Sequence, residues 1–137
     1  MSRRSAAVAR GAGAGLAVIV PVSVAVEVLD RGGREGSPWL LVPFAAVLGA
    51  YFLAGRIAAR RADAAPVLHG IAAGLTAFGA WLVLRAAVPV VRGDEIGFGT
   101  RAVLTNALLA GAFAAFGATT GAPARRDADP RHAPGRG

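Results

Sequence analysis

Four long stretches of uncharged, mostly apolar residues decide what this chain can fold into. They cover residues 11–26, 37–55, 64–84 and 102–124. An α-helix rises about 1.5 Å per residue, so about 20 residues cross a hydrocarbon core about 30 Å thick. Each stretch is close to that length once its apolar flanks are included. The sequence therefore predicts four membrane-spanning helices.

The predicted fold class is all-α: a polytopic transmembrane four-helix bundle with antiparallel, up-down connectivity and short loops. A soluble bundle would carry a charged residue every third or fourth position, whereas the charges here gather between the apolar stretches. The predicted transmembrane domain covers residues 11–121, between a cytoplasmic N-terminus, 1–10, and a disordered cytoplasmic tail, 122–137. Its spans are predicted at about 11–29, 38–59, 64–91 and 101–120.

Arginine placement predicts the orientation of these spans. All 15 basic residues are arginine, and ten of them lie before the first span, between the second and third, or in the tail. Five lie in the other two connections, where Glu27, Asp30, Glu35, Asp94 and Glu95 also lie. Basic residues near spans favour the cytoplasmic side. Both termini are therefore expected in the cytoplasm. Arginine without lysine indicates GC-rich coding, as in a high-GC bacterium, so the chain is expected in a bacterial inner membrane.

Two further features concern the membrane boundaries. Trp39 opens the second span and Trp81 nears the end of the third, so both are expected as anchors at the outer interface. Ser23-Val24-Ala25 also resembles the small-residue cleavage site of a signal peptide. Cleavage there would leave three spans in the same orientation. We favour an uncleaved helix because apolar residues continue beyond the cut.

Four polar side chains are predicted inside or at the edge of the spans. Glu27 and Arg85 lie near the outer ends of apolar stretches. They either pair or reach separately for the headgroups, or Glu27 faces a polar vestibule. His69 lies near the inner end of the third span, where it either relays protons or bonds a carbonyl. Asn106 is expected to form an interhelical hydrogen bond.

Small residues spaced four apart predict close helix packing. In lipid the hydrophobic effect does not drive helices together, so association depends on close approach and dispersion contacts. The predicted packing positions are Gly11, Gly15, Gly70, Gly74 and Gly111. They are interpreted as packing surfaces within the bundle, with a dimer interface as the alternative.

The sequence contains no recognisable set of catalytic, cofactor-binding or metal-binding residues. It has no cysteine, and its two histidines are far apart in the sequence, His132 being in the tail. No phosphate-binding glycine loop or paired carboxylates occur. The arginines are not interleaved with aromatics as in a nucleic-acid site. We therefore expect no enzyme, cofactor, metal or nucleic-acid partner. The expected partners are the lipid bilayer, including anionic lipid heads at the tail, and another copy or another membrane protein.

The stretch Gly49-Ala50-Tyr51-Phe52-Leu53-Ala54-Gly55-Arg56, followed by His69-Gly70 and Gly74, resembles a family of small, uncharacterised four-helix bacterial integral membrane proteins. That resemblance implies the same span layout and no established activity. The chain also has the length and span number of small multidrug transporters. Those transporters need a carboxylate deep in the first helix, whereas Glu27 lies at its end.

The function expected from these features is that of a structural, accessory or regulatory membrane protein that acts through helix–helix packing. The alternative is a small proton-coupled transporter or permeation subunit that works as an oligomer.

Overall fold

The structure, a computed structural model, describes residues 3–30, 41–62, 64–92 and 99–122. These residues form four helices and contain no strand, so the predicted all-α fold class is confirmed. The helices are α1 (Arg3–Asp30), α2 (Leu41–Arg60), α3 (Pro66–Arg92) and α4 (Thr100–Gly121). Each is long and apolar enough to cross a membrane. The chain therefore has the architecture of a multi-pass helical membrane protein.

The helix bounds differ from the predicted spans mainly at the start of the chain. α1 begins at Arg3, whereas the predicted span begins at residue 11 and treats 1–10 as a separate N-terminal segment. Hydropathy detects the apolar part of a helix, and a polar extension of the same helix leaves no such signal. α3 begins at Pro66, two residues after the predicted start, as expected for proline in a first helical turn. The predicted start of the second span lies outside the described residues.

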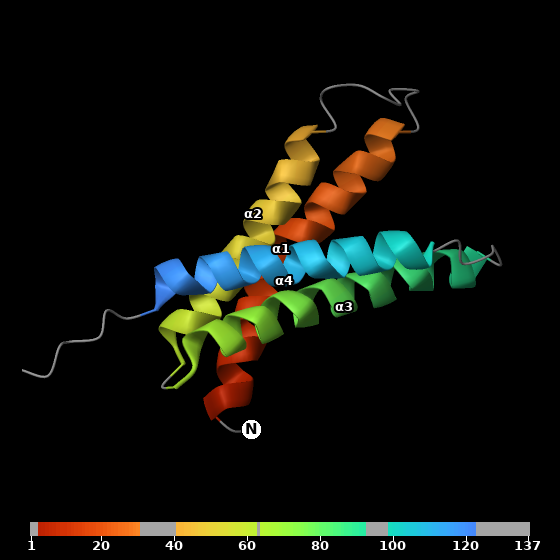
Figure 1. Cartoon of the computed structure of the whole chain (residues 1–137). Helices are drawn as coiled ribbons and strands as arrows, with labels where there is room; N and C mark the ends of the chain where they lie inside the picture. Colours follow the sequence, from red (N-terminus) through yellow and green to blue (C-terminus); the bar gives the residue numbers. More distant parts are fainter. Residues whose placement is uncertain (1–2, 31–40, 63, 93–98, 123–137) are drawn as a thin grey trace, which may run out of the picture.

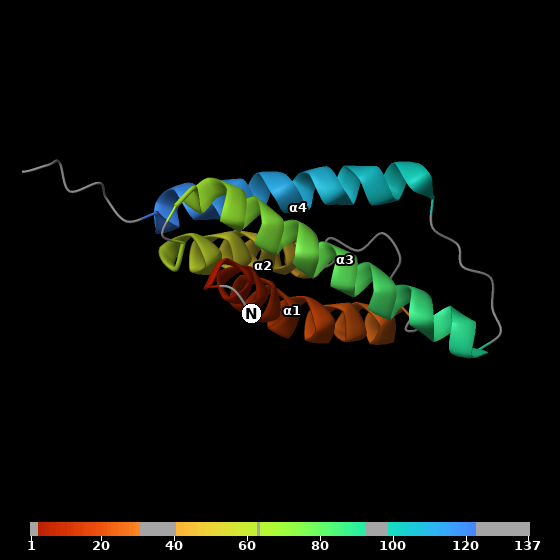
Figure 2. The same ribbon diagram turned by 90° about the horizontal axis from the view of Figure 1, so that it is seen from below.

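The helices form two pairs that cross (Figure 1). α1 lies beside α2, and α3 lies beside α4. Four helix ends lie close together at one end of the bundle: the start of α1, the end of α2, the start of α3 and the end of α4. At the other end, the α1–α2 pair lies apart from the α3–α4 pair. α2 and α3 each pack against all three other helices, while α1 and α4 lie on opposite sides of the bundle (Figure 2).

Glycine allows α2 and α4 to cross with their backbones in direct contact. A Cβ atom at Gly55 would overlap the carbonyl oxygen of Ala114, and one at Gly117 would overlap the carbonyl oxygen of Phe52. Each glycine therefore faces the backbone of the other helix. The rings of Phe52 and Phe116 pack beside this crossing, with centroids 5.5 Å apart.

Alanine fills most of the remaining interior. Ala54, Ala73, Ala77, Ala110 and Ala114 are fully buried. The larger buried side chains Ile19, Tyr51 and Phe78 pack with Ala12, Ala50 and Ala110 in one cluster. By contrast, many valine, leucine and phenylalanine side chains point outward on all four helices. Small residues inside and large apolar residues outside are the arrangement expected of helices packed in lipid.

Candidate functional site

A hydrogen bond between two polar side chains connects α1 and α3. The indole nitrogen of Trp81 donates a hydrogen bond to the hydroxyl oxygen of Ser23 across 2.8 Å. The Trp81 ring also packs against Phe78, with centroids 6.0 Å apart. Inside an apolar bundle this bond satisfies the indole donor, which would otherwise be costly to bury. Trp81 therefore joins α3 to α1, a role that its prediction as an interface anchor did not include.

Arg85 lies one turn beyond Trp81 on α3. Its guanidinium carbon is 5.6 Å from the centroid of the Trp81 ring, within the range of a cation–π interaction. Together, Ser23, Trp81 and Arg85 form what we call the indole bridge. The cation–π contact with Arg85 helps to hold the Trp81 ring in place. The Arg85 side chain itself is exposed.

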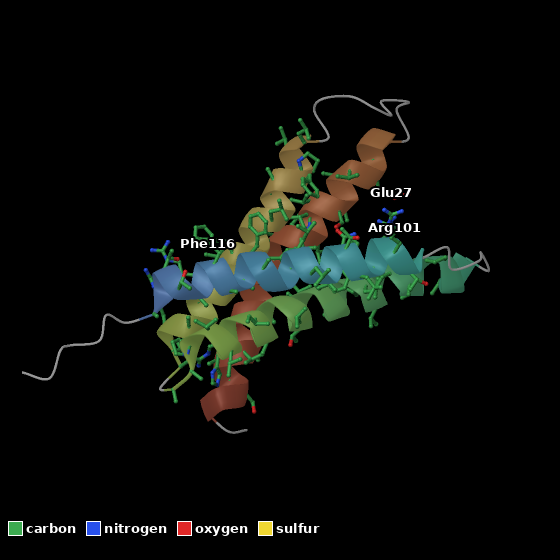
Figure 3. All side chains as sticks on the ribbon, viewed as in Figure 1. Glu27, Arg101 and Phe116 are labelled. Carbon is green, nitrogen blue, oxygen red and sulfur yellow. The ribbon has the colours of Figure 1, made fainter. Side chains whose placement is uncertain are left out.

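Glu27 lies one turn beyond Ser23 on α1, as Arg85 lies one turn beyond Trp81 on α3. Its side chain is exposed. Figure 3 shows Glu27 on α1 and Arg101 at the start of α4, on helices at opposite sides of the bundle. The approach of Glu27 to Arg85 stays a prediction.

His69 and Asn106 both form hydrogen bonds within their own helical segments. The Nδ1 atom of His69 is 3.1 Å from the carbonyl oxygen of Ala65, so the bond requires a proton on Nδ1. The amide nitrogen of Asn106 donates to the carbonyl oxygen of Ala102 across 2.8 Å. Asn106 is exposed in the first half of α4.

Four of the five predicted packing glycines lie at close contacts between helices. A Cβ atom at Gly11 would lie 2.6 Å from the carbonyl oxygen of Ala54, and one at Gly15 would lie 3.2 Å from the Cβ of the same alanine. At Gly70 and Gly74 it would overlap the Cβ atoms of Ala118 and Ala114. At Gly111 the nearest atom is Leu75 Cδ2 at 3.8 Å, an ordinary contact that alanine would tolerate.

Sequence reasoning missed the glycines of the α2–α4 crossing, Gly55 and Gly117, and it missed Arg56 as a site. Arg56 is half-buried on α2, and its Nε atom is enclosed with no hydrogen-bond partner among the residues that the structure describes. Its Cγ would lie 3.0 Å from a Cβ atom at Gly121 of α4. One sequence signal could have identified Arg56: it directly follows Gly55 and lies one turn before the end of α2.

Trp39, the other predicted anchor, lies outside the described residues. The described residues include no group of three or more histidine and carboxylate side chains that could hold a metal ion. Within the described residues, the arrangement provides helix packing, the Trp81–Ser23 hydrogen bond between helices and a half-buried cation at Arg56. Comparisons with protein-family models, curated proteins and solved structures found no match for this chain.

Proposed function

We propose that this chain is a structural or accessory component of a bacterial inner membrane, with both termini in the cytoplasm, and that it acts by packing its outer helix surfaces against another membrane protein or another copy. The observation that supports this proposal most is that small side chains fill the interior, whereas large apolar side chains lie on the outside. The interior depends on glycine and alanine, with backbones in contact at the α2–α4 crossing. Such a bundle keeps its shape while it offers its outer faces to partners.

The outer faces carry large apolar side chains on every helix. Val24 on α1, Phe44 on α2, Val83 on α3 and Leu108 on α4 are all exposed. The polar groups within the spans are mostly bonded inside the chain, as Trp81 is to Ser23 and Asn106 is to Ala102. A surface of this kind suits dispersion contacts with lipid or with another transmembrane helix.

Photo-crosslinking in native membranes tests the proposal. A photoreactive residue placed at Val83 or Leu108, which are 69% and 75% exposed, is expected to yield discrete adducts with protein. The matched controls are Ala54 and Ala110, both fully buried, where crosslinks should stay within the chain. One exposed position on each helix would sample the outer surface of all four helices.

Adducts with lipid alone at every outer position would overturn the proposal. A second assay separates it from transport: purified chain in proteoliposomes is expected to give no uptake driven by a pH gradient. Uptake that disappears with Glu27→Gln would replace the packing role with a proton-coupled one.

A further inference from the structure

Arg56 places a charged group one turn inside the end of the bundle where the four helix ends gather. It precedes Arg60, the last residue of α2, by four positions, which is about 6 Å along the helix axis. The side chain runs beside Gly121 at the end of α4. Because glycine has no side chain, the arginine stem can lie against the α4 backbone there.

The side-chain nitrogen atoms of Arg56 differ in how far they are buried. Nε is enclosed and has no acceptor among the described residues. The two terminal nitrogens are not enclosed in this way, and the residue as a whole is half-buried. The guanidinium therefore presents its outer edge to the surroundings one turn inside the end of α2, where the span is expected to meet the membrane interface. Leaving charged donors unpaired at this depth costs more than leaving neutral ones unpaired, so an external acceptor is expected.

The local charge favours an anion as that acceptor. Arg10, Arg60 and Arg61 are exposed at the same end of the bundle, and none of the side chains described there is a carboxylate. The helix dipoles add little, because the starts of α1 and α3 and the ends of α2 and α4 meet here and their opposite partial charges largely cancel. Among the described side chains at this end, the full charges are therefore those of the arginines.

We propose that Arg56 binds the phosphate of an anionic phospholipid headgroup. A guanidinium offers parallel N–H donors that match two phosphate oxygens. A zwitterionic headgroup also contains phosphate, but the neighbouring arginines would repel its cationic moiety. We therefore expect the site to prefer a headgroup with a net negative charge. The site holds one lipid at Arg56, and the exposed arginines around it attract anionic lipids without fixing them.

Native mass spectrometry of the full chain tests this assignment. The chain is reconstituted in mixed vesicles of phosphatidylcholine and phosphatidylglycerol and then extracted in mild detergent. We expect one phosphatidylglycerol to stay bound per chain at detergent levels that remove phosphatidylcholine. Arg56→Gln should abolish this retention, whereas Arg60→Gln, which removes the same charge one turn away on α2, should keep it.

Three results would overturn the proposal. The first is equal loss of retained phosphatidylglycerol in Arg56→Gln and Arg60→Gln, because general attraction would then explain the binding. The second is equal retention of phosphatidylcholine. The third is displacement of the lipid by excess inorganic phosphate, which would assign the site to a soluble anion. Circular dichroism of Arg56→Gln in phosphatidylcholine alone shows whether the variant folds, and Arg56→Lys, which keeps the charge without the planar fork, is expected to retain the lipid only weakly.

Discussion

At the scale of single residues, glycine serves two different purposes in this chain. Gly55 and Gly117 lie where two backbones touch, whereas a Cβ added at Gly13, Gly49 or Gly79 would have no described atom of another helix within 4 Å. The same residue type is therefore indispensable at some positions and replaceable at others. The distinction depends on what the neighbouring helix places opposite each glycine.

Gly55→Ala is expected to destabilise the bundle, because its new methyl group would overlap the Ala114 carbonyl oxygen and force α2 away from α4. Overpacking of this kind costs about 1–3 kcal/mol. Gly49→Ala, on the same helix, should leave the free energy of unfolding unchanged or raise it by up to about 1 kcal/mol through better helix propensity. Unfolding in mixed micelles with increasing sodium dodecyl sulfate, followed by circular dichroism, measures both. Equal stability of the two variants would contradict the crossing.

The sequence indicated some of these residue roles and not others. Spacing alone identified Gly11, Gly15, Gly70 and Gly74, which lie at close contacts, but it gave the same weight to Gly111, which does not. In a chain rich in alanine and glycine, four-residue spacings occur on every face of a helix. Which face meets a backbone is set by the crossing of two helices distant in sequence, and no local pattern records that.

At the scale of helices, the α2–α4 crossing behaves as one unit. Gly55 of α2 faces the α4 backbone, and Gly117 of α4 faces the α2 backbone, so a methyl group at either position separates the same two helices. The double variant Gly55→Ala/Gly117→Ala should therefore lose less stability than the sum of the single losses, by about 0.5 kcal/mol or more. The same micelle titration measures this. As a control, Gly55→Ala combined with Ser23→Ala, which acts on another helix contact, should be additive.

The indole bridge is the second feature at this scale, because it joins α1 and α3. Removing its hydrogen bond with Ser23→Ala or Trp81→Phe should lower stability, and the two effects should be coupled by about 0.6 kcal/mol, the mean for interhelical hydrogen bonds in membrane proteins. A double-mutant cycle in the same micelles gives the coupling energy. A coupling of zero would show that the bond contributes nothing to the folded state. Hydropathy placed Trp81 near a span end, but it could not reveal that Ser23, far away in the chain, lies opposite.

At the scale of the whole molecule, the four-helix architecture followed from the sequence because the length and polarity of a helix are local properties. The crossing of the α1–α2 pair with the α3–α4 pair did not, since short antiparallel connections are equally compatible with a nearly parallel bundle. The glycines at the α2–α4 contact supply the physical reason for the crossing. They let the two backbones touch where α2 and α4 cross, and the helices diverge beyond that contact.

Orientation in the membrane also belongs to this scale, because it depends on the summed charge of several segments. With ten arginines on one side and five on the other, both termini are expected in the cytoplasm. Native cysteine is absent from the chain, so single cysteines give an unambiguous map. Cysteines introduced at Ala64 and Thr100, both exposed and at opposite ends of the bundle, form a matched pair. In intact cells a membrane-impermeant thiol reagent should label Thr100→Cys at once and Ala64→Cys only after permeabilisation. Labelling in the reverse order would invert the topology and place Arg56 in the outer leaflet. Labelling of both cysteines in intact cells would mean that the arginine bias does not fix a single orientation.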